Sequence, residues 1–496
     1  MENFVGLDLG TTGVRAVVFD GNARQLGEAT EEYPLHTPHP GWAEQDPAEV
    51  VPAALRCLGR AAQDARLGKG ARVAVGVSGT FHSVLPLDER GEPLGRALIW
   101  ADTRAGEEAA AIREHHDVQK LYQRTGCPIH PMYLPAKIRW LRQNTPAARA
   151  FRSIKEQVLL RLAGVAACDL SVASGTGLLN LDRKSWDDEL LSIAGVEPGQ
   201  LGELCETTAT VGTITRETAD ATGLHRESVV VAGAGDGVLS SLGAGAIDVG
   251  QMTATIGTSG AVRLVADRPK VDRRARTWCY YLAEDRWVAG AAINNAGIAF
   301  RWAAEKLLRA GDRGYDHVAS WAEAVGPGAD GLLFLPFLTG ERAPYWNADA
   351  RGVLFGLAIG HDHRHVARAT LEGICFRMRS CYEALAEVAG PVREVRATGG
   401  FTKTPFWLQL LADVLQQPLA VPSVQEVSAL GAAELAMVAL GTMRLDDAKG
   451  RVELAAPIEP DQSKAGLYAR LYDLYMQVYW RLTDQFAEIA RLQRGG

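Results

Sequence analysis

One glycine- and threonine-rich turn occurs twice in this chain, half a sequence apart. Near the start stands Asp8-Leu9-Gly10-Thr11-Thr12-Gly13, and near the middle stands Thr255-Ile256-Gly257-Thr258-Ser259-Gly260. Each turn lies between two short apolar runs, which predicts a β-hairpin with glycine and hydroxyl residues at its tip. Backbone N–H groups and hydroxyls at such a tip can converge on a phosphate. Two tips in two halves suggest a nucleoside triphosphate held by two related lobes, although each turn alone also fits an ordinary hairpin.

Two aspartates stand where they could act on a phosphate. Asp8 belongs to the first turn, and a carboxylate there suits a hydrated Mg²⁺ ion. Asp236 follows a β-branched run at residues 229–232 and precedes a small-residue helical stretch. The end of a buried strand is where α/β proteins bind ligands, so Asp236 is our candidate general base. A helix N-cap is the alternative role for the same carboxylate.

The composition narrows the class of protein. A chain of 496 residues is too long for one hydrophobic core, so two or three domains are expected. The net charge of −7 gives no reason to expect a nucleic-acid or membrane partner. Seven cysteines without a Cys-x-x-Cys pair indicate reduced thiols. No signal peptide or membrane-spanning run is evident, and we therefore expect a cytoplasmic protein.

The order of expected elements repeats along the chain. In both halves strands come first and helices interleaved with strands follow, which predicts a duplicated α/β unit with a boundary near residues 243–250. We expect an N-terminal lobe over 1–245 and a C-terminal lobe over 246–496. Residues 466–492 show apolar side chains at helical spacing, including Leu474 and Ile489. This helix provides a packing face or, alternatively, a homodimer contact.

Four motifs in order resemble those of the FGGY carbohydrate kinases. No P-loop or protein-kinase signature is present. The resembling segments are 5–15 for the first phosphate motif, 232–236 for the catalytic base, 256–260 for the second phosphate motif, and 397–404 for the adenosine motif. The resemblance covers essentially the whole chain. It implies an α/β fold of two ribonuclease-H-like lobes, as in actin, hexokinase and Hsp70, with ATP in the interlobe cleft. It also implies sugar and phosphate binding by the N-terminal lobe, 1–245, and ATP binding by the C-terminal lobe, 246–496.

The resemblance also implies a role for individual residues. Asp8 would order Mg²⁺ through water, with Asp236 as the second carboxylate near the metal. Asp236 would accept the proton of the sugar hydroxyl, as a general base does. The residues implied for ATP are Thr11, Thr12, Arg15, Gly257 and Thr258 at the phosphates, and Gly297, Gly399, Gly400 and Thr404 at the adenosine, where glycine lets a ligand approach the backbone closely.

The acceptor is indicated by segments that vary within the family. The family's acceptor site draws on residues 78–83 and 100–104, which supply His82, Trp100 and Asp102 here. Glycerol kinases carry Arg-Glu where this chain has Phe-His at 81–82, so glycerol is disfavoured, and xylulokinases are a closer match. Residues 124–132, 153–156 and 171–181 look most like the gluconokinases of the family. The implied reaction is ATP-dependent phosphorylation of a sugar acid, D-gluconate to 6-phospho-D-gluconate.

Two alternatives remain open at this point. Xylulose or another neutral polyol could be the acceptor in the same kinase family. An actin-like ATP-binding module for assembly or regulation would be a protein of a different class, and Asp236 together with the sugar-site segments argues against it.

Three basic side chains could recognise the acceptor. Lys155 could pair with the carboxylate of a sugar acid as a cation with three donors, or it could be a surface lysine paired with Glu156 or Asp169. His82 and His130 could bond sugar hydroxyls, or they could be structural. Many relatives place an aspartate in the neighbourhood of Lys155, so a lysine there suggests contact with a sugar acid, and both roles stay open at this point.

Overall fold

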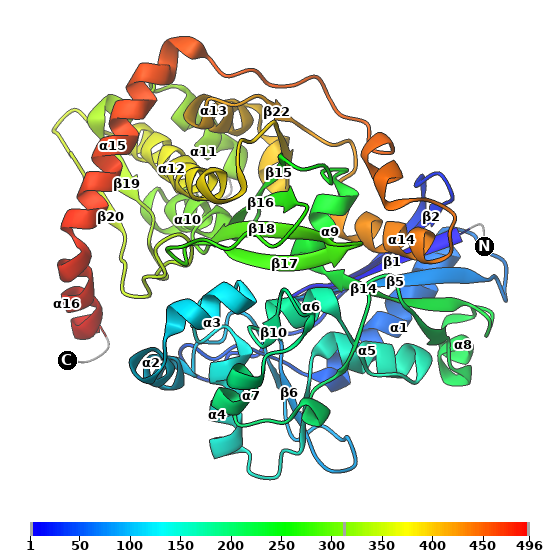
Figure 1. Ribbon diagram of the computed structural model, residues 1–496. Helices are drawn as coiled ribbons and strands as arrows, with labels where there is room; N and C mark the ends of the chain where they lie inside the picture. The colour runs from blue at the N-terminus through cyan, green and yellow to red at the C-terminus, as the bar shows by residue number, and fades with distance from the viewer. Residues whose placement is uncertain (1–2, 311–313, 494–496) are drawn as a thin grey trace. The chain divides into compact units, whose positions relative to one another are not determined.

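The computed structural model describes residues 3–310 and 314–493, and the chain divides into two compact units (Figure 1). Unit 1 contains Met1–Val249, Val265–Ala289 and Glu426–Val452, and unit 2 contains Gly250–Leu264, Gly290–Gln425 and Glu453–Gly496. Two segments from the second half of the sequence thus belong to unit 1. The division of binding roles between an N-terminal and a C-terminal lobe stays a prediction.

A six-stranded sheet forms the centre of unit 1. Its order is β13 (Thr210–Thr213), β14 (Val229–Gly235), β5 (Val73–Gly79), β1 (Asn3–Leu9), β2 (Gly13–Asp20) and β3 (Gln25–Glu32). Strands β1, β2 and β3 are antiparallel neighbours, whereas β5 is parallel to β1 and β14 is parallel to β5. The first glycine-threonine turn joins β1 to β2, so the predicted hairpin is confirmed.

Helices cover both faces of this sheet. Val5, Leu7 and Val75 share one hydrophobic cluster with helix α1 (Pro47–Asp64). Because side chains alternate along a strand, Gly6 and Gly76 face the other side. The helices of unit 1 are α1, α2 (Gly106–His115), α3 (Val118–Thr125), α4 (Leu134–Asn144), α5 (Ile154–Ala163), α6 (Leu170–Gly175), α7 (Asp188–Ala194), α8 (Arg216–Thr222), α9 (Asp236–Gly243) and α14 (Val427–Ala439).

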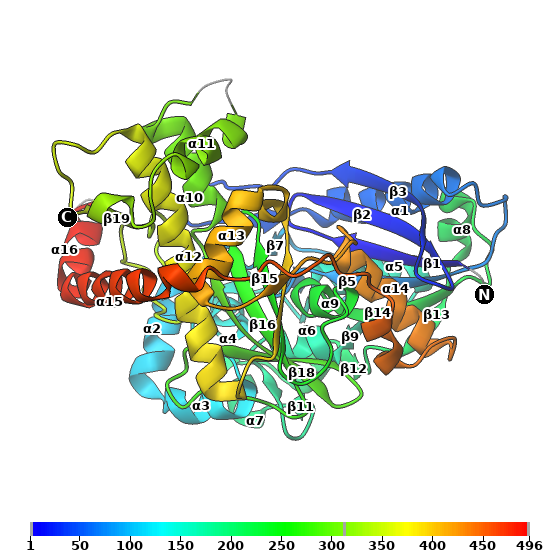
Figure 2. The same ribbon diagram turned by 90° about the horizontal axis from the view of Figure 1, so that it is seen from above.

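Helix α14 lies directly on the glycine face of the sheet. A Cβ atom at Gly6 would lie 1.8 Å from the carbonyl oxygen of Ala429, and one at Gly76 would lie 1.9 Å from that of Ala432. Figures 1 and 2 show α14, in orange, beside the blue strands β1 and β5. This backbone contact explains why a segment that follows the adenosine motif in sequence belongs to unit 1.

The remaining strands of unit 1 are short. Strand β17 (Trp278–Ala283) contributes Cys279 and Tyr281 to a hydrophobic cluster with Leu170 and Val172 of α6. The other strands are β4 (Glu44–Gln45), β6 (Leu85–Leu87), β7 (Ala97–Leu98), β8 (Ala150–Arg152), β9 (Ala167–Asp169), β10 (Leu179–Asn180), β11 (Ser185–Trp186) and β12 (Glu203–Cys205).

The sheet of unit 2 repeats the strand order of unit 1. It has six strands in the order β17, β18 (Arg286–Ile293), β16 (Gly260–Ala266), β15 (Gln251–Ile256), β21 (Glu394–Thr398) and β22 (Leu419–Ala420), and the last five correspond to β3, β2, β1, β5 and β14. Strand β15 is antiparallel to β16 and parallel to β21, as β1 is to β2 and β5. The second glycine-threonine turn joins β15 to β16, so the predicted duplication of an α/β unit with ribonuclease-H-like strand order is confirmed.

Helices and a short hairpin complete unit 2. The helices are α10 (Gly297–Trp302), α11 (Gly314–Glu323), α12 (His363–Ala389), α13 (Pro405–Leu415), α15 (Ala465–Arg481) and α16 (Thr483–Gln493), and the hairpin is β19 (Leu333–Leu335) with β20 (Val353–Phe355). The single helix expected over 466–492 is therefore two helices, which are separated at Leu482. The predicted apolar face is also partly wrong, because Leu474 is 40% exposed.

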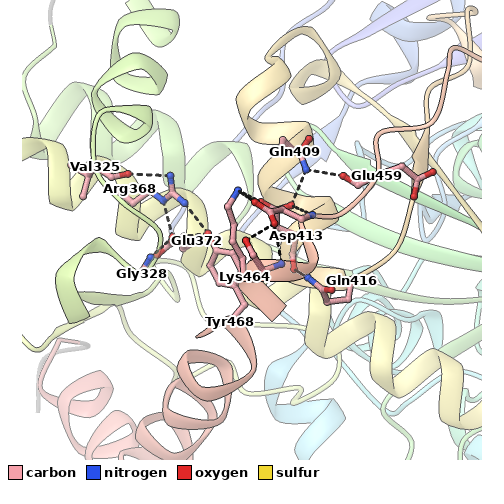
Figure 3. Close-up of polar contacts among 12 residues, drawn as sticks. Val325, Gly328, Arg368, Glu372, Gln409, Asp413, Gln416, Glu459, Lys464 and Tyr468 are labelled. Atoms are coloured by element: carbon pink, nitrogen blue, oxygen red, sulfur yellow. Dashed lines mark hydrogen bonds and ion pairs between the residues drawn. The ribbon is translucent and has the colours of Figure 1, made fainter. Parts of the chain in front are cut away.

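Tyrosines form the buried face of α15, and polar contacts fasten this C-terminal part to α12 and α13 (Figure 3). The hydroxyl of Tyr468 accepts a 2.7 Å hydrogen bond from Arg368 and donates one of 3.1 Å to Glu372. Lys464 Nζ donates to Asp413 Oδ2 at 2.8 Å. A tyrosine such as Tyr468 can bury its ring while its hydroxyl keeps a polar partner, which aliphatic spacing alone does not indicate.

The structure also bears on membrane insertion and on the cysteines. Across the part of the chain that the structure describes, no helix is both long and apolar enough to cross a bilayer. All seven cysteines are free thiols, and only Cys205 is not fully buried.

Replacement of Gly76 by alanine should disturb the seat of α14. We expect Gly76→Ala to lower the free energy of unfolding by about 1–3 kcal/mol or more, because the new methyl group would overlap the α14 backbone. Gly21→Ala is the matched control, since a Cβ there meets no atom within 4 Å, and it should change stability by less than about 0.5 kcal/mol. Urea unfolding of both variants measures the difference, and equal stabilities would contradict the contact.

Candidate active site

Three carboxylates of unit 1 influence one another near the first glycine-threonine turn. Asp8 lies in β1, Asp236 begins α9, and Glu426 immediately precedes α14. Burial, together with the charges of Asp236 and Glu426, raises the pKa of Asp8 from its usual 3.8 to about 6 against the opposing effects of Ser78 and Arg15. Ser78 Oγ donates a 2.5 Å hydrogen bond to Asp8 Oδ1. Concentrated negative charge of this kind favours a bound cation.

Arg15 supplies the positive charge of this cluster. It lies directly opposite Asp8 in the β1–β2 register. Its guanidinium forms an ion pair with Glu426, and its Nε donates to Thr30 Oγ1 at 3.0 Å. The hairpin register therefore brings together Asp8 and Arg15, the predicted metal-ordering and phosphate-facing residues.

Side chains from three other segments fix the first turn. Gln45 Nε2 donates to the carbonyl oxygens of Gly10 and Thr11 at 2.9 and 3.0 Å, and the Tyr33 hydroxyl donates to Gly10 at 2.7 Å. Trp100 Nε1 donates to Thr11 Oγ1 at 3.0 Å. Gln45 and Tyr33 were not among the residues predicted from the sequence, because they belong to no recognisable motif. The adjoining Thr12 is exposed at the tip of the turn.

Strand β14 delivers Asp236 to the first turn of α9, as predicted. Gly235 occupies the N-cap position, and Asp236 Oδ1 accepts a 2.6 Å hydrogen bond from the N–H of Gly237. The N-cap alternative for Asp236 is therefore wrong. A carboxylate in the first turn of a helix is stabilised by the positive end of the helix dipole.

Lys155 of α5 is buried rather than exposed on the surface. Its Nζ donates to Asp169 Oδ2 at 2.7 Å and to the carbonyl oxygen of Ala234 at 3.1 Å. The side chains of Lys155 and Asp169 are each 1% exposed. The pairing with Asp169 weighed from the sequence is present, but inside the protein. Contact with a substrate carboxylate stays a prediction, whereas the geometry favours support of β14 two residues before Asp236.

The two acceptor segments adopt different hydrogen-bonding roles. The ring Nδ1 of His82 donates to the carbonyl of Gly175 at 2.7 Å, which makes Nε2 an acceptor in the neutral ring. Asp102 is fully buried, and its oxygens accept from Arg104 and from the N–H of Ala43. The predicted substrate contact of Asp102 remains untested, and its bonds show that it organises the loop that carries Trp100.

His130 has the complementary arrangement of ring nitrogens. Its Nδ1 accepts from the N–H of Met132 at 3.2 Å, so the neutral ring carries its proton on Nε2. An acceptor nitrogen on His82 and a donor nitrogen on His130 both suit hydroxyl groups, which can donate and accept.

An aromatic group adjoins His82 and was missed from the sequence. The Tyr280 ring centre lies 4.7 Å from that of Phe81 and 5.9 Å from that of His82, and Trp278 stacks on Tyr280 at 4.2 Å. The Tyr133 hydroxyl is 3.0 Å from the Tyr280 hydroxyl. The run of aromatic residues at 278–281 was the available signal, but sequence order placed it in the other lobe.

Unit 2 contains a pocket of about 320 Å³ beside the second glycine-threonine turn. The predicted residues Gly257, Thr258, Gly297, Gly400 and Thr404 line it, together with Ile256, Phe300, Arg301, Phe401, Lys403 and Trp407. The aromatic rings of Phe300 and Trp407 are 5.1 Å apart. A small pocket with aromatic walls and a few polar groups suits a flat heterocycle.

Glycines allow the close approach of backbone around this pocket. A Cβ at Gly297 would lie 2.3 Å from the carbonyl oxygen of Gly257. Gly399 does not line the pocket, but it precedes Gly400 with φ of 96° and leaves no space for a Cβ beside Ile256. The motif glycines thus shape the pocket because they have no Cβ atom.

The predicted metal-binding residues are the two carboxylates Asp8 and Asp236. Within residues 3–310 and 314–493, no group of three or more His, Cys, Asp or Glu side chains could hold a metal ion. The donor chemistry of Asp8 and Asp236 nevertheless fits a Mg²⁺ ion held through water, because both are carboxylates, their charges interact, and Mg²⁺ retains several waters.

Comparison with known proteins identifies the family. Residues 3–243 match the N-terminal domain of the FGGY family of carbohydrate kinases, and residues 252–440 match the C-terminal domain. The chain therefore belongs to the FGGY family of carbohydrate kinases.

The similar proteins are named for two different acceptors, gluconate and xylulose. A gluconokinase of Bacillus subtilis (strain 168) is 37% identical over 509 residues, which cover 99% of this chain and 98% of the relative. The gluconate kinase structure from Lactobacillus acidophilus has a TM-score of 0.93 at 31% identity and covers 98% of this chain and 99% of its own. A xylulose kinase structure from Lactobacillus acidophilus has a TM-score of 0.94, also at 31% identity, with 99% and 100% covered. Backbone similarity alone does not choose between these acceptors.

The pKa of Asp8 leads to a prediction about stability and pH. Because this pKa is raised to about 6, the folded state keeps a proton that the unfolded state has lost between about pH 4 and pH 6. The free energy of unfolding of the wild type therefore falls relative to that of Asp8→Asn as pH rises through this range. In metal-free buffer, Asp8→Asn should be more stable than wild type by about 1–3 kcal/mol at about pH 8. The two proteins should be equally stable at about pH 4. Urea unfolding at both pH values measures this, and a difference that does not change with pH would contradict it.

Proposed function

We propose that this chain transfers the γ-phosphoryl group of ATP to a sugar acid, converting D-gluconate to 6-phospho-D-gluconate. The observation that carries the choice of acceptor is the 37% identity with a gluconokinase over 99% of the chain. Asp236 near Asp8 and the complementary histidines His82 and His130 support phosphoryl transfer to a hydroxyl group.

In the proposed reaction, Asp236 accepts the proton of the primary hydroxyl of gluconate. The hydroxyl oxygen forms a bond to the γ-phosphorus as the bond from this phosphorus to the leaving oxygen of ADP breaks. The dipole of α9 and the N–H of Gly237 stabilise the Asp236 carboxylate before the proton arrives. A general base of this kind contributes about 10²- to 10⁴-fold to the rate.

The donor side of the reaction is assigned to residues of both turns. We assign adenosine to the pocket of unit 2 and the phosphates to Thr11, Thr12, Arg15, Gly257 and Thr258. Asp8 and Asp236 would hold Mg²⁺ through water, and the bound ion supplies neutralisation of phosphate charge. ATP and the free thiols fit a cytoplasmic enzyme.

The partners expected on this account are small molecules. The net charge of −7 supports this over a nucleic-acid partner. A homodimer stays a proposal, supported by the exposed Trp480 and Leu492 of α15 and α16.

Xylulose is the second candidate acceptor. The Phe81-His82 pair noted in the sequence favours it, because xylulokinases are the closer match at these positions. Release of ADP, coupled to an optical readout, should be measured with gluconate, xylulose, glycerol and no acceptor. Turnover dependent on gluconate is expected. Turnover with xylulose alone would overturn the sugar-acid proposal, and acceptor-independent release alone would overturn the kinase proposal.

Replacement of Asp236 tests the proposed base. Asp236→Asn should lower kcat by about 10²- to 10⁴-fold, because the proton acceptor is removed. Binding of ATP without Mg²⁺ should change little, because Asp236 is not among the residues assigned to ATP. Asp220→Asn is the matched control, since Asp220 lies in the same unit with its side chain 74% exposed, and it should retain wild-type turnover. A folded Asp236→Asn variant with wild-type kcat would refute the assignment.

Replacement of Lys155 separates substrate contact from structural support. Lys155→Met leaves Asp169 buried without its cation, which should cost about 3–5 kcal/mol of stability. The double variant Lys155→Met/Asp169→Asn limits this cost. We expect kcat of the double variant to fall by a similar factor for gluconate and for any neutral acceptor that the wild type turns over. A higher KM for gluconate alone would instead support contact with the substrate carboxylate.

A further inference from the structure

Lys137 of α4 is a second buried lysine, and its ammonium group donates hydrogen bonds to backbone carbonyl groups of unit 1. The residue is 0% exposed, and its Nζ donates to the carbonyl oxygens of His82 at 2.8 Å and Ile99 at 2.6 Å. Burial lowers the pKa of Lys137 to about 7, against the opposing charge of Asp102. Burial of a charged lysine away from solvent costs free energy, so this residue requires a compensating role in the fold.

The two carbonyl groups belong to the two segments assigned to the acceptor. His82 follows β5 in one segment, and Ile99 immediately precedes Trp100 in the other. The segments are separated in sequence, and the ammonium group of Lys137 joins them through one atom. The distance between the backbone at residue 82 and the backbone at residue 99 is thereby limited by two hydrogen bonds.

His82 needs this support because its backbone is strained. Its φ of 65° lies in the left-handed region, which costs a residue with a Cβ about 1 kcal/mol or more. The bond from the His82 ring to Gly175 fixes the side chain, and the bond from Lys137 to the His82 carbonyl fixes the peptide. Together they determine where Nε2 of His82 lies.

We propose that Lys137 is a positioning residue for the acceptor, which holds the His82 and Trp100 segments at the separation that the sugar requires. The inference rests on the proposed function in that the acceptor binds at these segments. Without Lys137, the carbonyl of His82 loses its donor, and the carbonyl of Ile99 keeps only the 3.0 Å hydrogen bond from the N–H of Asp102. A buried carbonyl left unsatisfied costs about 1–3 kcal/mol. The segments would then separate and admit water, so the affinity for the acceptor would fall more than the affinity for ATP.

The first test compares two variants of the same helix. Lys137→Met removes both hydrogen bonds, whereas Leu141→Ala, one turn further along α4, removes packing in a hydrophobic cluster that contains Leu134 and Ile138. Lys137→Met should raise KM for the acceptor at least about tenfold and leave KM for ATP within about twofold. Leu141→Ala should lower the melting temperature but keep both KM values. Equal changes in the two KM values of Lys137→Met, or the same rise in acceptor KM for Leu141→Ala, would overturn the proposal.

Chemical rescue provides a test that a general loss of stability cannot mimic. Lys137→Ala leaves space for the three methylenes and amine of the missing side chain. Propylamine added to this variant should restore the KM for the acceptor, whereas butane, which has a similar length but no donor, should not. Absence of rescue in a folded Lys137→Ala protein, or equal rescue by both compounds, would overturn the positioning role.

Hydrogen exchange separates this inference from the proposed function. In Lys137→Met, amide exchange should become faster in residues 80–83 and 98–102, and it should stay unchanged there in Leu141→Ala. This readout holds even if the wild type phosphorylates no sugar, in which case the proposed function fails and the backbone contact can still stand. Unchanged exchange in both segments of Lys137→Met would refute the contact itself.

Discussion

The convergence of negative charge at Asp8, Asp236 and Glu426 is the constraint on which the site of unit 1 depends. These residues come from β1, α9 and the start of α14, so they meet only if α14 lies close to both other elements. Glycines make this possible: a Cβ at Gly243 of α9 would lie 1.8 Å from the carbonyl oxygen of Val427, and one at Gly6 would lie 1.8 Å from that of Ala429. The same backbone contacts therefore define unit 1 and assemble its carboxylates.

Buried cations connect polar groups of the segments around this site. Lys155 supports Ala234, two residues before Asp236, and Lys137 joins His82 to Ile99. Arg104 engages Asp102 and lies 3.5 Å over the ring of Trp42. Lys137 and Lys155 donate to backbone carbonyls, and Arg104 donates to a carboxylate. Contact of Lys155 with a substrate carboxylate stays a prediction.

Local patterns made much of this structure predictable from the sequence. The two hairpins, the strand before Asp236 and the glycines of the unit 2 pocket follow from turn residues, apolar runs and motif order. The position of α14 could not be predicted, because contact between Gly6 and Ala429 is a long-range property. The burial of Lys155 was missed for the same reason. The face of α15 was partly misassigned because buried tyrosines replace the expected aliphatic residues, leaving Leu474 exposed.

The central claim is transfer of phosphate from ATP to the primary hydroxyl of a sugar acid. The most direct measurement is a proton-coupled ³¹P NMR spectrum of the products that the wild-type chain forms from ATP, Mg²⁺ and D-gluconate. A phosphate ester of a CH₂ group gives a triplet, and the account predicts this signal beside those of ADP. A doublet would place the phosphate on a secondary hydroxyl, and inorganic phosphate alone would mean hydrolysis, so either result would contradict the account.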